Sequence, residues 1–107
     1  MKRYRFQALV TPAPTPAGTG PAPLDSAAHR MVLRCVNHET HRGQVFRVLV
    51  AAEGDMPVWR GRPQIIVTMN VIGDDVCDCL EIGSRFSLWN GDDVGQGIVT
   101  RRLPILL

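Results

Sequence analysis

Apolar and polar residues alternate along most of this chain with a period of two, which is the repeat of a β-strand. In segment 3–10, RYRFQALV, the arginines and the glutamine fall on one face. The opposite face is apolar and consists of Tyr4, Phe6, Ala8 and Val10. Further segments with alternation or many β-branched residues are 30–37, 43–51, 63–72, 85–90 and 95–103. The pattern therefore predicts six strands.

The alternation also predicts which side chains share a face. In segment 30–37, Met31, Leu33 and Cys35 lie together and Arg34 lies opposite. Segment 43–51 is a strand of valine and phenylalanine with Arg47 on one side. Segment 63–72 is the richest in β-branched residues. One of its faces consists of Ile65, Val67, Met69 and Val71, and the other of Ile66, Thr68 and Asn70.

Six short strands, with little sign of the 3.6-residue period of a helix, favour an all-β domain, either a closed barrel or a sandwich. Closure is preferred in so short a chain because it removes exposed strand edges. Segment 73–84, GDDVCDCLEIGS, contains the only expected helical turn. Segment 11–29 is rich in proline and alanine, so we expect it to be a mobile loop within a single domain, 1–107. The alternative is that this segment is itself a ligand for an aromatic groove.

The composition changes this picture little. The chain has 107 residues, of which 45% are hydrophobic and 21% are charged, and its net charge is +2. This small charge does not favour a nucleic-acid binder, which usually carries a large basic excess. The basic first residues are not followed by the apolar region of a signal peptide, and no segment is long and apolar enough for a membrane span. Three cysteines are most consistent with free thiols in a cytoplasmic protein.

The glycines of segment 85–103, RFSLWNGDDVGQGIVTRRL, raise the question of a phosphate-binding loop. Such a loop precedes a helix, whereas here an alternating, β-branched segment follows Gly97. The lysine of a nucleotide loop is missing, and Asp92 and Asp93 would repel a phosphate. Asn90 and Gly91 instead predict a β-hairpin, because both residues tolerate positive φ. Gly95 and Gly97 then indicate a bulge or a close approach of another backbone, and no nucleotide or other cofactor is expected.

Segment 85–103 resembles the closing segment of the third, C-terminal domain of elongation factor Tu. The matching positions are Arg85, Phe86, Leu88, Gly91, Val94, Gly95, Gly97 and Val99. Weaker similarity covers most of the chain from about residue 30, together with the first strand. The resemblance implies a six-stranded Greek-key β-barrel, here as a stand-alone domain without the GTPase part. The strand count from periodicity agrees with it.

Two departures bear on the function that the resemblance implies. In the family, a basic and aromatic stretch after the first strand and the tip of the last hairpin help to contact the T stem of tRNA. Here the proline- and alanine-rich loop stands in place of the basic and aromatic stretch. At the tip of the last hairpin, Asp92 and Asp93 follow Gly91. Carboxylates facing a phosphate backbone weaken binding. The resemblance therefore supports the fold more strongly than it supports a role in tRNA binding.

Neither catalysis nor metal binding has a specific motif in this sequence. The spacing of the cysteines and of His29, His38 and His41 lacks the paired C-x-x-C pattern of zinc sites. The acidic pairs that follow Gly73 and Gly91 are explained by turn chemistry, since a calcium loop needs more oxygen ligands. His38 beside Glu39 would be an acid–base pair, but no nucleophile stands at a relay spacing. We therefore expect a binding module and not an enzyme.

The expected partner is a protein, because this domain of the family packs against other domains and factors. The alternative is RNA, bound through arginine side chains. In segment 57–64, PVWRGRPQ, Trp59 stands beside two arginines and can anchor a protein, stack on a base or plug the barrel. Trp89, at the end of a strand, could have any of the same three roles. The candidate partner-binding residues are Trp59, Arg60, Arg62, Arg30, Arg34, Arg101, Arg102, Asn90 and Gly91.

Overall fold

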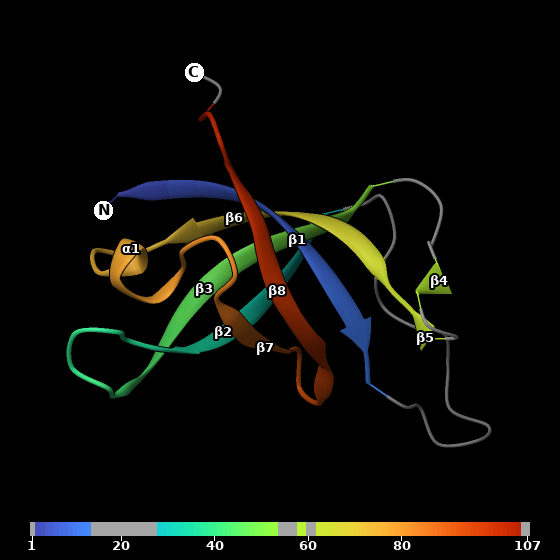
Figure 1. Ribbon diagram of the computed structural model, residues 1–107, viewed down its shortest axis with the longest axis horizontal. Helices are drawn as coiled ribbons and strands as arrows, with labels where there is room; N and C mark the ends of the chain where they lie inside the picture. Colours follow the sequence, from blue (N-terminus) through green and yellow to red (C-terminus); the bar gives the residue numbers. More distant parts are fainter. Residues whose placement is uncertain (1, 14–27, 54–57, 60–61, 106–107) are drawn as a thin grey trace.

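The computed structural model describes residues 2–13, 28–53, 58–59 and 62–105, and only the backbone at 58–59 and 62–63. The elements are β1 (Arg3–Pro12), β2 (His29–Val36), β3 (Gly43–Ala52), β4 (Val58–Trp59), β5 (Arg62–Pro63), β6 (Ile65–Ile72), α1 (Val76–Cys79), β7 (Arg85–Trp89) and β8 (Asp93–Leu103). Six of the strands form a closed antiparallel barrel in the order β1-β6-β3-β2-β7-β8, and β8 pairs with β1 (Figure 1). The expected all-β, six-stranded barrel is confirmed.

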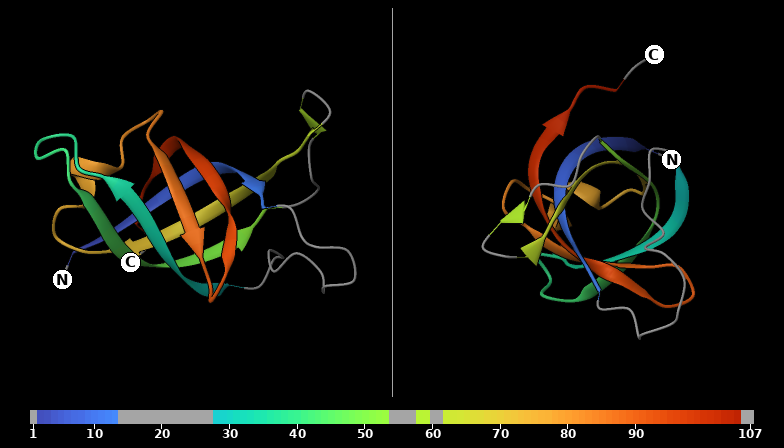
Figure 2. Two further views of the ribbon diagram at one scale, coloured as in Figure 1. Left: turned by 90° about the horizontal axis from the view of Figure 1, so that it is seen from below. Right: turned by 90° about the vertical axis from the view of Figure 1, so that its right-hand side faces the viewer.

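The topology is that of a Greek key. Strands β2, β3 and β6 follow one another in the chain, with only the short β4 and β5 between β3 and β6. The same three strands are neighbours in the barrel, and β1 pairs with the other edge of β6. This is the arrangement of three hairpin-connected strands with a fourth beside the first. The view along the barrel in Figure 2 shows the strands closing into a ring. α1 lies at one end of the barrel, and the small β4–β5 hairpin lies at the other (Figures 1 and 2).

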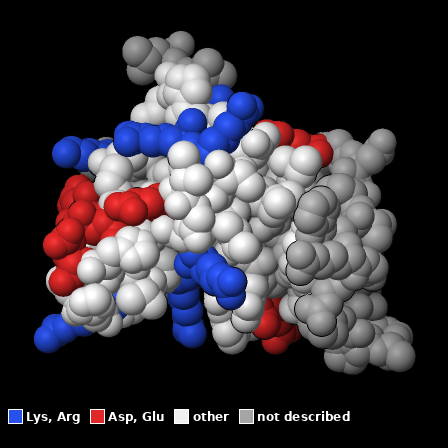
Figure 3. Space-filling model, viewed as in Figure 1, with Lys and Arg blue, Asp and Glu red and all other residues white. Residues whose placement is uncertain are grey.

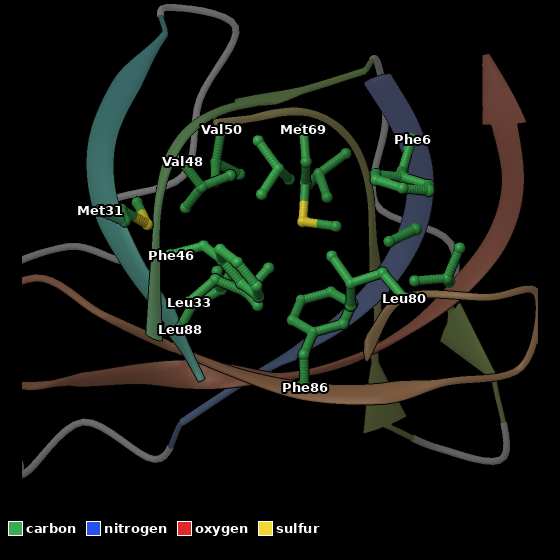
Figure 4. Packing of buried hydrophobic residues seen from close by; sticks show 14 of the residues in the cluster. Phe6, Met31, Leu33, Phe46, Val48, Val50, Met69, Leu80, Phe86 and Leu88 are labelled. Atoms are coloured by element: carbon green, nitrogen blue, oxygen red, sulfur yellow. The ribbon is translucent and has the colours of Figure 1, made fainter. Parts of the chain in front are cut away.

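The barrel interior is filled by the apolar faces that the alternation predicts. Figure 4 shows labelled side chains from β1, β2, β3, β6 and β7 and from the turn after α1 converging on the barrel axis. Buried residues of the predicted faces are Phe6, Ala8, Val10, Met31, Leu33, Cys35, Ile65, Val67, Met69 and Val71. Tyr4 packs against this core while half-buried. Arg34 and Arg47 are exposed on the opposite faces, as expected.

The glycines of β8 allow it to approach its neighbours closely. A Cβ at Gly95 would lie 2.5 Å from the backbone oxygen of Thr11, and a Cβ at Gly97 would overlap the ring of Phe86. The register also shifts between Leu88 and Trp89, because Leu88 pairs with Gly95 while Trp89 pairs with Asp93. The hairpin, the bulge and the close approach predicted for this segment are thus confirmed.

The structure corrects two details. Strand β1 continues to Pro12 and β2 begins at His29, so the predicted loop 11–29 is too long at both ends; residues 14–27 lie outside the described part of the chain. The hairpin tip has positive φ only at Gly91, and the N–H of Asn90 bonds to the carbonyl of Asp92. Asn90 therefore does not adopt the conformation expected of it.

The helical turn expected in segment 73–84 contains two of the cysteines. If Cys77 and Cys79 lay on a strand, they would share a face. They lie instead in α1, the expected helical turn, where residues two apart point in different directions. Cys79 is accordingly buried, whereas Cys77 is exposed.

Candidate functional site

The outer wall formed by β2, β3 and β7 carries apolar side chains that face solvent. Outward positions alternate along β2, so Arg30, Val32, Arg34 and Val36 all lie on this wall. Val36 is 54% exposed and Val45, which pairs with Arg34, is 61% exposed. Single exposed apolar residues are ordinary, but neighbouring ones on paired strands form a patch that marks interaction surfaces.

An arginine and a tryptophan meet on this wall, across β2 and β7. The guanidinium carbon of Arg34 lies 4.8 Å from the centre of the Trp89 ring, which is a cation–π contact. The contact follows from the sheet register, because Val32 pairs with Trp89 and Arg34 pairs with Ser87. Trp89 therefore lies next to Arg34 diagonally across two strands, on the outward face. The question left open for Trp89 is resolved: it is half-buried on the outer wall and does not enter the barrel.

Two further strand pairs extend the wall. Across β2 and β3, Val32 pairs with Arg47 and Arg30 pairs with Leu49. Arginine and apolar side chains thus alternate along both strands, with no acidic residue at the outward positions of β2 and β3. We call this surface the arginine–valine wall, and its members are Arg30, Val32, Arg34, Val36, Val45, Arg47, Leu49 and Trp89.

A groove of about 740 Å³ adjoins this wall. It runs from the end of β1, near Leu9 and Thr11, over β8 and β7 to Arg34 and Val36 of β2. Arg85 of β7 and Ile98 of β8, which pair with each other, also line it. The groove therefore joins positive charge to apolar surface.

Charge is distributed unevenly over the described part of the molecule. Among the described acidic residues only Asp93 lies on a barrel strand. The arginines of the barrel strands are Arg3, Arg5, Arg30, Arg34, Arg47, Arg85, Arg101 and Arg102. Figure 3 shows one acidic group at the side of α1 and another at the β7–β8 hairpin, apart from basic side chains along the strands. The barrel wall is thus basic and the turns are acidic.

The remaining candidate residues do not all join this site. Arg101 and Arg102 lie on β8 beyond the last residue paired with β7. The guanidinium of Arg102 lies 5.1 Å from the centre of the Tyr4 ring. Asn90 and Gly91 form the hairpin tip next to Trp89 and are exposed. The backbones of Trp59 and Arg62 pair in the small hairpin, but their side chains and Arg60 lie outside the described residues.

A polar cluster at the α1 end of the barrel has a structural explanation. His38 Nε2 and Ser84 Oγ are 3.1 Å apart, and Ser84 Oγ also accepts a bond from the N–H of Glu81. Within the described part of the chain His38 bonds no carboxylate, so the pair lacks the acid that orients a catalytic histidine. Among the described hydrogen bonds, that of Glu39 is made by its backbone N–H, which donates to Asn37 Oδ1. The cluster ties two turns together.

The two buried thiols, Cys35 and Cys79, belong to the hydrophobic core. Burial raises the pKa of the Cys35 thiol well above its usual range, and burial likewise raises the pKa of Cys79. The Cys79 thiol donates to Gln44 Oε1 at 2.8 Å. Thiolates are the nucleophiles and metal ligands, so these protonated thiols act as core residues. Among the described residues no group of three or more His, Cys, Asp or Glu side chains is placed to hold a metal ion.

No protein-family model, curated protein or solved structure matches this chain. The similarity of segment 85–103 to elongation factor Tu therefore stays an expectation about ancestry, while the barrel itself is observed. Within the described ranges, no helix has the length and apolar content needed to cross a bilayer.

Several residues of the arginine–valine wall were not singled out from the sequence. Val32, Val45 and Leu49 occupy outward positions that the period of two assigns to solvent. An apolar residue at such a position is the signal that identifies them. Arg47 was placed outward but was not considered a partner-binding residue, and Arg85 was noted only for its match to the elongation factor segment.

Proposed function

We propose that this chain is a non-enzymatic binding module that recognises a protein partner through the arginine–valine wall. The observation that supports this most directly is the Arg34–Trp89 contact, which lies among exposed valine and leucine side chains. Tryptophan and arginine dominate the binding energy of protein interfaces. Interface centres are also apolar and low in acidic residues, which describes this wall.

The rigidity of the barrel supports the same function. Trp89 and Arg34 lie on adjacent, paired strands, so the scaffold holds both side chains before a partner arrives. Pre-ordered side chains lose less conformational entropy on binding. Because the strands of the closed barrel are paired over most of their length, we expect the partner to be recognised through side chains on the wall.

The resemblance to elongation factor Tu suggests where the partner belongs. If the similarity of segment 85–103 reflects common ancestry, a component of the translation machinery is the partner to test first. The partner would be recognised in the cytoplasm, where free thiols such as those of this chain persist.

Affinity capture from a nuclease-treated native lysate tests the function. Wild-type protein, Trp89→Ala and Ile82→Ala are compared; Ile82 is an apolar control because it is 73% exposed and lies in the turn between α1 and β7. Loss of a central tryptophan costs about 2 kcal/mol or more, roughly thirtyfold in Kd. We expect wild type and Ile82→Ala to retain the same proteins and Trp89→Ala to lose them. Equal retention by all three would refute the proposal.

RNA is a second candidate because arginines predominate on the barrel strands. Binding to RNA through phosphates would make the logarithm of the affinity fall with the logarithm of salt, by about 0.7 per contact for a single strand. Replacing Arg101 and Arg102 with glutamine would flatten this slope by about one to two units. Partners that disappear after nuclease treatment would favour RNA over the protein partner.

A further inference from the structure

The barrel is least continuous between β2 and β7. Strand β2 pairs with β3 through eight residue pairs, from His29 to Val36. It pairs with β7 through only three, at Val32, Leu33 and Arg34. Beyond Arg34, Cys35 and Val36 therefore have no partner in β7, and both line the groove together with Arg85 and Phe86. The groove enters the wall where these two strands part.

Two arginines flank this opening without an acidic partner. Arg34 pairs with Ser87, and Arg85 lies two residues before Ser87 on the same outward face. Neither side chain forms an ion pair within the described part of the chain. Both arginines line the groove, so each can attract an anionic group that enters it. Arginine binds a carboxylate through two parallel N–H bonds, which fixes the orientation of the ligand.

Trp89 prepares Arg34 for such a ligand. The guanidinium lies over the Trp89 ring, so one planar face is occupied by the contact. A stacked guanidinium keeps its N–H groups in its own plane, and those groups remain directed toward a ligand at its edge. The stacking also restricts the rotamers of Arg34, which lowers the entropy lost on binding.

Apolar side chains continue the groove on both sides of the arginines. Val36 lies beyond Arg34 on β2, and Ile98, which is 41% exposed, pairs with Arg85 on β8. Leu9 pairs with Ile98 from β1. An extended peptide places every second side chain on the same face, so acidic and apolar residues that are two positions apart can both face this groove.

We infer that the groove between β2, β7 and β8 binds an extended segment of the partner that carries acidic and apolar side chains. Its carboxylates contact Arg34 and Arg85, and its apolar side chains contact Val36 and Ile98. Asp93 also lines the groove and pairs with Trp89, so it repels carboxylates near the β7–β8 turn, and the acidic residues of the segment contact the two arginines on the side away from it. This inference rests on the proposed function and specifies the chemistry of the partner.

A peptide is favoured over RNA by the lining of the groove. Valine, isoleucine and leucine bury apolar peptide side chains, whereas base recognition in single strands uses aromatic stacking platforms. The described aromatic residue on the wall is Trp89, and its ring is engaged by Arg34.

The test uses a fluorescein-labelled peptide, Asp-Ser-Val-Ser-Asp-Ser-Val, of about the length of an ordinary strand, in which Asp and Val alternate on one face of the extended chain. The matched peptide contains Asn in place of Asp. Fluorescence anisotropy is measured at about 50 and 150 mM salt, because attraction between exposed charges is screened. We expect wild-type protein to bind the Asp peptide at least about tenfold more tightly than the Asn peptide. Arg34→Gln combined with Arg85→Gln should remove that difference, and Arg42→Gln, in an exposed turn, should preserve it.

Reversing the charge of the two arginines distinguishes a loss of binding from a loss of folding, because a folded variant should gain affinity for a peptide of opposite charge. Arg34→Glu combined with Arg85→Glu should bind a Lys–Val peptide and lose the Asp–Val peptide, while thermal melting reports an intact barrel. Arg34→Lys should bind several-fold more weakly than wild type, since lysine lacks the planar fork.

The following outcomes would overturn the inference. One is equal binding of the Asp and Asn peptides. Another is displacement of the Asp peptide by a single-stranded oligouridine that carries the same number of negative charges as the peptide. A third is self-association that Arg34→Gln with Arg85→Gln abolishes, because a second copy would then occupy the groove. If lysate proteins still depend on Trp89 while the peptide does not bind, the proposed function stands and this inference fails.

Discussion

Gly97 has no Cβ, and this allows β8 to pack closely over Phe86. The ring of Phe86 is buried in the barrel, and a methyl group at Gly97 would overlap it and lie 3.0 Å from the backbone oxygen of Leu9. Neither the backbone of β1 nor a buried ring can move without disturbing other contacts, since cores are close-packed. The sequence indicated a close approach here, but it could not identify Phe86 as the neighbour.

Replacing Gly97 with alanine tests this packing. Overpacking a core costs about 1–3 kcal/mol, so Gly97→Ala should lower the urea midpoint clearly. Gly43→Ala is the matched control, because the nearest atom to its added Cβ is the oxygen of Cys35 at 4.0 Å. The control should stay within about 0.5 kcal/mol of wild type. If both variants unfold at the same urea concentration, the close packing described for Gly97 is wrong.

Glu53 gives the fold a pH-dependent contact. Its carboxylate accepts bonds from the Thr68 hydroxyl and from Gln7 Nε2, and these bonds lower the pKa of Glu53. The folded pKa lies below the unfolded one, so the stabilisation is present above the unfolded pKa, ordinarily about 4.3. It is lost as the pH falls through the folded pKa.

The effect of Glu53→Gln on the free energy of unfolding should therefore shrink between about pH 6 and pH 3. Because the carboxylate is exposed, we expect about 1 kcal/mol or less at the higher pH. Glu39→Gln, in an exposed turn, serves as the control for removing one surface charge. Urea titrations at each pH supply the measurement. A Glu53→Gln effect that does not change with pH would contradict the role assigned to this carboxylate.

At the scale of elements, α1 depends on the barrel for its existence. A helix of four residues cannot sustain itself, and α1 is held because Val76, Cys79 and Leu80 join the core. The N–H of His38 also bonds to the carbonyl of Asp78, which links α1 to the turn after β2.

Leu80→Ala should therefore destabilise the protein by about 2–5 kcal/mol through the cavity that it leaves. Ile82→Ala removes a similar side chain two residues away, but this side chain is exposed, so it should change the unfolding free energy by less than about 0.5 kcal/mol. Thermal or urea denaturation distinguishes the two. Similar values for both variants would show that α1 does not close the core.

The elements that could be predicted from the sequence are those with local signals. Alternation within a strand depends only on neighbours along the chain, so the inward faces of β1, β2 and β6 were predicted correctly. The Arg34–Trp89 contact was not, because it depends on the register between β2 and β7, which are distant in sequence. Which cysteine of segment 73–84 is buried could not be predicted, because a short turn carries no measurable period. The side chains of Trp59 and Arg62 lie outside the described residues, so their roles remain predictions.

For the whole molecule, the position of the glycines bears on nucleotide binding. Gly95 and Gly97 lie within β8, and no helix follows them in the described chain. A phosphate site of the usual kind needs the N-terminus of a helix after its glycines.

GTP and ATP should consequently leave the melting temperature unchanged. A ligand at a hundred times its Kd adds about 2.7 kcal/mol to the stability. In a domain of this size, that would raise the melting temperature by roughly 10 °C or more. Differential scanning fluorimetry with millimolar nucleotide makes the measurement. A rise of this size with either nucleotide would require a binding site that the hairpin does not explain.

The pairing of β1 with β8 determines how the barrel responds to mechanical force. Arg5 pairs with Leu103 and Pro12 pairs with Gly95, so the start of β1 and the end of β8 lie side by side. Tension applied at Arg3 and Leu103 would open the ladder one pair at a time, like a zip. Tension applied at Arg3 and Asp93 would load the whole ladder at once in shear. In an optical trap the barrel should therefore yield at a lower force in the first geometry, although its thermodynamic stability is the same in both.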